Sequence, residues 1–392
     1  MKILLILVLL VIIWLEIYFL TFNKNVAGQA DQKANKIIDY CKTQNIYKNS
    51  CYDSEIPKLL DKLSGKNVFE VVRIIQEKDA DYAYCHVVGH EIAARLTAKD
   101  PSKWREVLAQ CTLGICSNGC QHGVLQEKFR NESFSETEIT QIIPDLSSVC
   151  EPSDLIQLSG FEISHCYHGL GHLLMYMTEG DTKKASSLCK EIALKDDNRD
   201  YLDVCYEGVF MQLFQPLEPE DFSLVDGKAP QKNSLRKYCE SFKDPRTTES
   251  CWIEGWPLYS SEIKNPKGLV GYCETSKDTD QKERCYKMLF AVISQSQNFD
   301  INSISVYCEG FNETLKYKCY SGAATAIIQA TYQNGPKAVN LCSLAKNVKD
   351  QDKCFDELLK YANYNLSSDK ESYKLLCSSF VDPWKSKCLS EN

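Results

Sequence analysis

Residues 335–364 read GPKAVNLCSLAKNVKDQDKCFDELLKYANY, and this stretch contains the pattern that decides the fold. After the second cysteine, apolar residues recur at i, i+3, i+4 and i+7, the periodicity of one helix face, at Phe355, Leu358, Leu359 and Ala362. A helical pattern also leads into the first cysteine, and polar, turn-like residues separate the two. The stretch therefore predicts a helix hairpin in which Cys342 ends the first helix and Cys354 begins the second.

The same spacing recurs along the chain. In the carboxy-terminal half, the second cysteines of successive units are 34, 34, 35 and 34 residues apart, at Cys251, Cys285, Cys319, Cys354 and Cys388. The amino-terminal half keeps the pattern with steps of up to 46 residues. A fixed period of about 20–50 residues marks an array of structural repeats. We therefore predict an all-α solenoid of about ten helix hairpins, irregular over residues 37–234 and regular over residues 235–392.

The 20 cysteines are expected to form disulfides, because their number is even and they fall in a fixed register. Closing a loop of about 15 residues stabilises a fold by roughly 3 kcal/mol in the chain-entropy model. A disulfide within each hairpin would therefore hold its turn together. The predicted pairs are Cys41–Cys51, Cys150–Cys166, Cys189–Cys205, Cys239–Cys251, Cys273–Cys285, Cys308–Cys319, Cys342–Cys354 and Cys377–Cys388.

The second and third units depart from this register. Cys85 has no first cysteine before it, whereas Cys111, Cys116 and Cys120 provide one too many. Spacing favours Cys111–Cys120 and leaves Cys116 for Cys85, but the order of cysteines alone does not fix their connectivity. A rival interpretation takes Cys111, Cys116 and Cys120, together with His122, as a zinc or iron–sulfur site. Oxidation of exported thiols opposes it.

The amino terminus indicates export. After Lys2 the chain is apolar for about 20 residues, the length that spans a bilayer, with Glu16 as the one interruption. We predict a membrane anchor over residues 1–23, with a cleaved signal peptide as the alternative, and a linker over residues 24–36. The body would then face a periplasm, the cell surface or a secretory lumen, where disulfides persist. A net charge of −8 argues against a nucleic-acid partner.

All six histidines lie between residues 86 and 172. When the second helices are aligned on their cysteines, three histidines and a glutamate fall on one stripe across neighbouring helices, and two more histidines form another i, i+4 pair. Imidazole nitrogens bind zinc, copper or iron, and two histidines at i, i+4 can chelate one ion. The predicted metal ligands are His86, His90, His122, His168, His172 and Glu207.

The distance between units limits this hypothesis. The second and fourth units are not neighbours, so their histidine pairs would be nearly 20 Å apart at ordinary helix spacing. His86 and His90 would then need His122 or Glu91 as a partner. Three methionines follow the stripe and are either soft copper ligands or core filling: Met175, Met177 and Met211.

Two further interpretations of the histidines stay open. They could form a buried polar network, or they could act as metal-free acid–base groups in a hydrolase or oxidoreductase. No nucleophile elbow, phosphate loop or dinucleotide motif is present, and His90-Glu91 is not followed by the second histidine of HExxH. The sequence therefore assigns no catalytic residue and leaves open whether the protein is an enzyme.

The period, the hairpin form and the cysteine pairing over residues 37–392 resemble disulfide-stapled helical repeat proteins of the Sel1-like and tetratricopeptide kind. The glycine signature of Sel1-like repeats is only echoed, in CYEGVF (205–210) and CYSGAA (319–324). The resemblance implies a superhelical surface that binds a protein or peptide partner, and it implies no reaction. A metal-free interaction scaffold is therefore the alternative to a metal-binding protein.

Overall fold

The computed structural model describes residues 28–44, 47–79, 82, 85–108, 110–111, 116, 119–129, 136–151, 160–196, 199–216, 219–366 and 370–390. The chain divides into two compact units, residues 1–83 and residues 84–392. The predicted anchor at 1–23 lies outside the described residues. Among those that are described, no helix has both the length and the apolar character needed to cross a bilayer.

The first unit contains a helix over residues 28–43, α2 (Lys48–Glu55), a 3-10 turn (Pro57–Asp61) and α3 (Gly65–Lys78). Part of the predicted linker at 24–36 is therefore helical. Within this part of the linker the buried apolar residues are Ala30 and Ala34, whose small side chains give little apolar signal in the sequence. The Cys41–Cys51 disulfide joins the first helix to α2.

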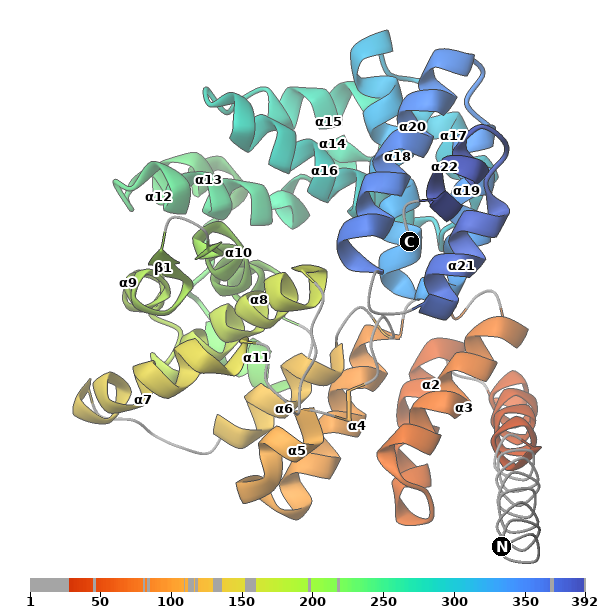
Figure 1. The fold of residues 1–392 in the computed structure, drawn as a ribbon. Helices are drawn as coiled ribbons and strands as arrows, with labels where there is room; N and C mark the ends of the chain where they lie inside the picture. Colours follow the sequence, from red (N-terminus) through yellow and green to blue (C-terminus); the bar gives the residue numbers. More distant parts are fainter. Residues whose placement is uncertain are drawn as a thin grey trace, which may run out of the picture. The chain divides into compact units, whose positions relative to one another are not determined.

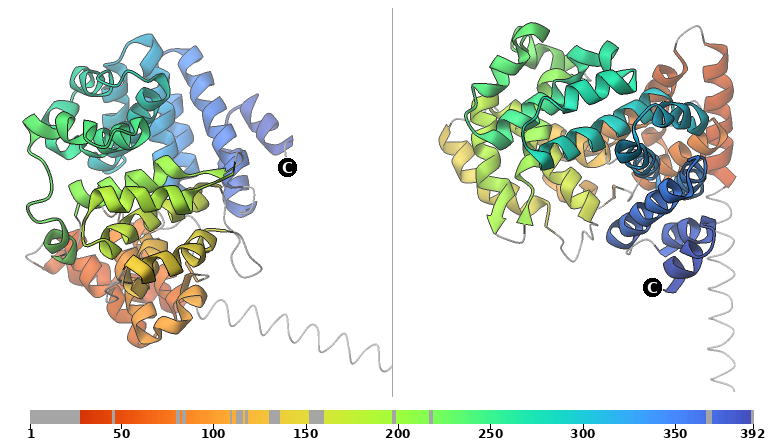
Figure 2. Two further views of the ribbon diagram at one scale, coloured as in Figure 1. Left: turned by 90° about the vertical axis from the view of Figure 1, so that its left-hand side faces the viewer. Right: turned by 90° about the horizontal axis from the view of Figure 1, so that it is seen from above.

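The second unit is almost entirely helical (Figures 1 and 2). In chain order its helices are α4 (His86–Lys99), α5 (Trp104–Leu108), α6 (Gly119–Phe129), α7 (Glu136–Val149), α8 (Gly160–Met177), α9 (Thr182–Ala193), α10 (Leu202–Phe214), α11 (Pro219–Val225), α12 (Leu235–Glu240), α13 (Pro245–Glu254), α14 (Ser260–Ile263), α15 (Pro266–Cys273), α16 (Thr279–Ser296), α17 (Ile301–Glu309), α18 (Glu313–Ala330), α19 (Gly335–Ser343), α20 (Val348–Asn365), α21 (Lys370–Ser379) and α22 (Trp384–Ser390).

The all-α prediction is confirmed except for one short β-hairpin. Strands β1 (Leu194–Asp196) and β2 (Arg199–Asp200) pair antiparallel between α9 and α10. They lie in the connection between Cys189 and Cys205, which are 16 residues apart, whereas the cysteines of the regular hairpins are 11 or 12 apart. The strands therefore occupy the extra length of this longer connection.

Ten disulfides engage all 20 cysteines. The eight predicted hairpin pairs are all present, and the irregular region contains Cys85–Cys116 and Cys111–Cys120. A zinc or iron–sulfur site built on the clustered cysteines is thereby wrong, because no free thiolate is left to bind the metal. So many disulfides indicate an oxidising, extracytoplasmic environment.

The second helix of each regular hairpin begins earlier than predicted. The N-cap residues of α13, α16, α18 and α20 each lie seven residues before the second cysteine, at Asp244, Asp278, Asn312 and Asn347. Each side chain accepts a hydrogen bond from a backbone N–H of the first turn, a contact worth about 1 kcal/mol. The cysteine therefore lies two turns inside the helix, and part of the segment interpreted as a turn is helical.

The second helices of the hairpins pack against one another in rows. Contacts run from α4 to α6, α8, α10 and α13, and again from α16 to α18 and α20. First helices α17, α19 and α21 form a further row that packs beside α18 and α20. Helix α20, at the end of the second row, also contacts α8 in the first row, so the two rows come together there (Figure 1). Residues from distant repeats consequently line the same space.

Candidate metal centre

Two neighbouring helices bring three histidines together. His86 and His90 lie one turn apart on α4, and His122 lies in the first turn of α6. Each of the three offers a ring nitrogen, and these nitrogens all lie within 4.8 Å of one another. Among the residues that the structure describes, these three form the group whose donor atoms lie close enough together to hold one metal ion.

The close approach of α6 to α4 depends on glycine. A Cβ added to Gly123 would lie 2.7 Å from the Cα of His90, a separation that real Cβ atoms do not tolerate. Gly119, one turn earlier, faces the backbone of His86 in the same way. Both glycines therefore allow the two helices to pack closely, because a residue without a Cβ lets a neighbouring backbone approach.

We expect Gly123→Ala to destabilise the protein by about 1–3 kcal/mol, the usual penalty for overpacking a tight contact. The matched control is Gly271→Ala, because Gly271 also lies inside a helix but its added Cβ would meet nothing within 4 Å. The control should gain up to about 1 kcal/mol from helix propensity. Thermal unfolding compares the two variants, and equal midpoints would contradict the role assigned to Gly123.

Backbone carbonyls fix the tautomers of two of the three rings. The Nδ1 of His86 lies 3.2 Å from the carbonyl oxygen of Cys116, and the Nε2 of His122 lies 3.1 Å from that of His165. A carbonyl only accepts hydrogen bonds, so each of these nitrogens carries the proton. In a neutral ring, the lone pair is then on the other nitrogen, Nε2 of His86 and Nδ1 of His122.

The lone pair of His122 is buried. The side chain is 4% exposed, and its Nδ1 has no hydrogen-bond partner among the described residues. Burial, and after it the nearby rings led by His86, lowers the pKa of His122 well below its ordinary value. The ring is therefore neutral at physiological pH, which is the form that binds a metal ion.

The other ring nitrogens approach one another closely. The Nε2 atoms of His86 and His90 are 3.0 Å apart, and the ring centroid of His122 is 5.1 Å from that of His86 and 5.4 Å from that of His90. Glu91, the other partner considered for this pair, forms an exposed ion pair with Arg95. His122 is therefore the residue that completes the group.

His122 also connects the two histidine pairs. Its ring centroid is 5.7 Å from that of His168 and 5.5 Å from that of His172, both on α8. The pairs on α4 and α8 thus belong to one cluster with α6 between them. Burial lowers the pKa values of both α8 histidines, so these rings are neutral too.

Three of the predicted ligands have other partners. The Nε2 of His168 lies 3.3 Å from the Met211 sulfur, and the Nδ1 of His172 lies 2.6 Å from the Gln212 side-chain oxygen. Glu207 pairs with the guanidinium of Arg284 at 2.5 Å. The structure thus brings the histidines of the stripe together but does not place Glu207 with the group of three.

One polar contact in this region was missed from the sequence. Helix α11, which follows α10, carries Asp221, which is buried and accepts hydrogen bonds from Tyr176 and Gln126. Its negative charge raises the pKa of His172, although burial has the larger, opposing effect. Asp221 is 95 residues from Gln126 in the chain, and no spacing pattern links the two.

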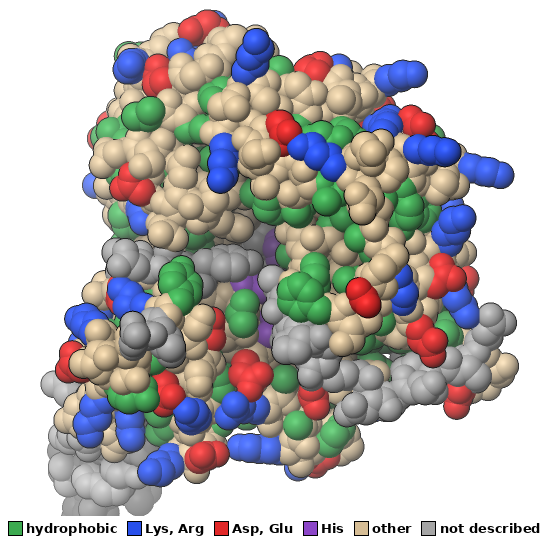
Figure 3. All heavy atoms as spheres, turned by 180° about the vertical axis from the view of Figure 1, so that it is seen from behind, with side chains coloured by type: hydrophobic (Ala, Val, Ile, Leu, Met, Phe, Trp, Pro, Cys, Tyr) green, Lys and Arg blue, Asp and Glu red, His purple; other side chains and the backbone are tan. Residues whose placement is uncertain are grey.

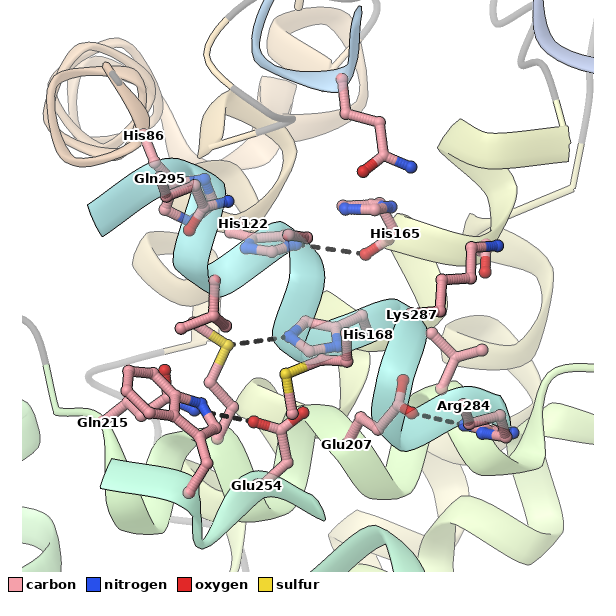
Figure 4. A pocket seen from close by; sticks show the side chains of 18 residues that line it. His86, His122, His165, His168, Glu207, Gln215, Glu254, Arg284, Lys287 and Gln295 are labelled. Carbon is pink, nitrogen blue, oxygen red and sulfur yellow. Dashed lines mark hydrogen bonds and ion pairs between the residues drawn. The ribbon is translucent and has the colours of Figure 1, made fainter. Parts of the chain in front are cut away.

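A pocket of about 400 Å³ opens beside the cluster (Figure 4). His86, His122, His165 and His168 lie along part of its wall, and most of the remainder comes from α10, α13, α16 and the residues just after α10 and α13. In Figure 3 histidine atoms are visible in a hollow of the surface. The volume is within the range of small-molecule sites.

The helix positions that form the histidine stripe continue into this wall in later hairpins. Glu207 and Met211 of α10, and Lys287 and Ala291 of α16, are the residues two and six places after their cysteines, and all four line the pocket. Sequence alignment of the hairpins therefore identified an inner face. It did not identify Glu254, whose pKa is raised by burial and then by Glu207.

No family model, curated protein or solved structure matches this chain.

Proposed function

We propose that the protein is an exported metal-binding protein that holds one transition metal ion, zinc by preference, through His86, His90 and His122. Three neutral imidazoles with a fourth position left open form a recurrent zinc site in proteins. Nitrogen ligands about 2.0–2.1 Å from zinc are about 3.3 Å apart at the tetrahedral angle. The 3.0 Å between the Nε2 atoms of His86 and His90 is close to this value.

The buried Nδ1 of His122 is the observation that carries the proposal. In a metal-free polar network, this nitrogen would keep an unsatisfied lone pair, which costs about 1–3 kcal/mol in a buried position. A metal ion between the three rings would use that lone pair. The carbonyl oxygens of Cys116 and His165 would then act as outer partners that orient the ligands.

The fourth coordination position would face the pocket. His86 and His122 both line it, so water or a small ligand could reach an ion held between them. A site of this kind exchanges ligands, whereas a structural zinc site is closed by four protein ligands. The proposal therefore favours a metal that interacts with a small molecule over a metal that only stabilises the fold.

The setting of this centre is also inferred. We propose that residues 1–23 anchor the protein in a membrane and that the helix hairpins form a solenoid like that of Sel1-like and tetratricopeptide proteins. The disulfides support an exported location, and the regular cysteine period supports the repeat architecture.

Elemental analysis of the full chain, purified in detergent without an affinity tag, tests the metal site. We expect about one equivalent of zinc per chain, and loss of that zinc from the His86→Gln/His90→Gln double variant, because a metal with one remaining ligand is weakly held. His165→Gln is the matched control, since it removes a nearby ring but keeps the carbonyl that orients His122. Failure of wild-type protein to take up zinc after stripping and reloading would disprove the proposal.

A further inference from the structure

The structure separates the methionines of the described residues into two kinds. Met175 and Met177, on α8, are 0% and 4% exposed and belong to the core. Met211 on α10 and Met288 on α16 are only partly buried, and both line the pocket beside the histidines. Core filling, the usual role of methionine, accounts for the first pair and not for the second.

Met211 directs its sulfur at a ring nitrogen. Its Sδ atom lies 3.3 Å from the Nε2 of His168, a contact drawn as a dashed line in Figure 4. Two donor atoms that each lie about 2.0–2.3 Å from one ion are roughly 3–4 Å apart. The observed spacing of 3.3 Å falls in the range of two ligands of a shared ion.

The chemistry of this donor pair selects the ion. A thioether is a soft, uncharged ligand that favours copper(I), whereas zinc and other harder divalent ions prefer imidazole, thiolate or carboxylate. Neither imidazole nor thioether adds a negative charge. Because the cost of placing an ion in a low-dielectric site rises with the square of its charge, such a pair favours a monovalent cation over a divalent one.

We propose that His168 and Met211 form a copper(I) subsite in the wall of the pocket, with the sulfur of Met288 available in the same cavity. This subsite goes beyond the proposed zinc centre and does not rest on it, because the two share no ligand. The rings of His168 and His122 are neighbours, 5.7 Å apart between centroids, so the two positions would border the same space.

A purely structural contact is the competing explanation. In that case the sulfur of Met211 packs against the ring of His168, and replacing it with leucine leaves metal binding unchanged. Met175→Leu is the matched control, because it makes the same chemical change at a core position of α8.

Anaerobic titration of the full chain with copper(I), against a chromophoric copper(I) chelator, tests the subsite. The His86→Gln/His90→Gln variant serves as background, so that copper(I) cannot use the two proposed zinc ligands of α4. We expect this background to bind one copper(I), Met211→Leu to weaken binding at least about tenfold, the lower limit for disturbing a metal's outer shell, and Met175→Leu to leave it unchanged.

X-ray absorption of the copper(I) form provides a second readout. A sulfur scatterer at about 2.3 Å from the copper is expected. Unchanged copper(I) affinity in a folded Met211→Leu variant, or a first shell without sulfur, would overturn the proposal. Because the background variant lacks His86 and His90, failure of the zinc centre leaves this test unaffected, and the two proposals fail separately.

Discussion

We expect the single substitution His122→Gln to lower zinc affinity by at least about 100-fold, more than the 10–100-fold that changes in a metal's outer shell produce. His122 is the one candidate ligand contributed by α6, and its Nδ1 is buried with no hydrogen-bond partner among the described residues. Without it, the pair on α4 would hold an ion by two ligands only.

The measurement is the gain in thermal stability when zinc is added to metal-free protein. At a zinc concentration 100 times the dissociation constant, binding to the folded state alone stabilises by about 2.7 kcal/mol. Wild type and His165→Gln should show this gain, and His122→Gln should show almost none at the same concentration. An equal gain in all three proteins would remove His122 from the metal centre.

A second large effect is expected from the Cys85–Cys116 disulfide. This bond spans 31 residues and joins the residue before α4 to the segment before α6. Removing a disulfide that closes a loop of this length lowers the free energy of unfolding by about 3–4 kcal/mol in the chain-entropy model. Cys85 precedes His86, and the carbonyl of Cys116 accepts a hydrogen bond from that ring. Cys85→Ser/Cys116→Ser should therefore lose both stability and zinc affinity.

The matched control is Cys377→Ser/Cys388→Ser, which opens a disulfide of 11 residues in the last hairpin. This variant should also unfold at a lower temperature, but its zinc affinity should equal that of wild type, because α21 and α22 do not contribute to the metal centre. Thermal unfolding and zinc competition titration are performed on both variants. A zinc affinity that falls equally in both would mean that the effect is general destabilisation.

The hairpins could be predicted from the sequence because their signals are local. The two cysteines of a predicted pair are 10 to 16 residues apart, and the apolar face of a helix repeats every three or four residues. The cap residues at Asp278 and Asn312 are equally local signals, and their fixed distance from the cysteines marks where the second helices begin.

The sequence by itself determined that the fold is helical, repeated and held by disulfides, and that the histidines share one face. These properties depend on residues close together in the chain and on a period that recurs. Only the tertiary structure decided which histidines meet, because the distance between two ring nitrogens depends on how closely two helices pack. At α4 and α6 that distance is set by Gly123 against the backbone of His90.

The same reason explains why Glu207 pairs with an arginine and why Met211 faces a histidine. Arg284, which pairs with Glu207, is 77 residues away in the chain, and the ring that faces Met211 is 43 residues away. No periodic pattern reports such a partner, since the pairing arises only when the row of helices turns and brings distant repeats around one pocket. The sequence pattern therefore identified the candidate donor residues, and the packing of the helices determined which of them lie close together.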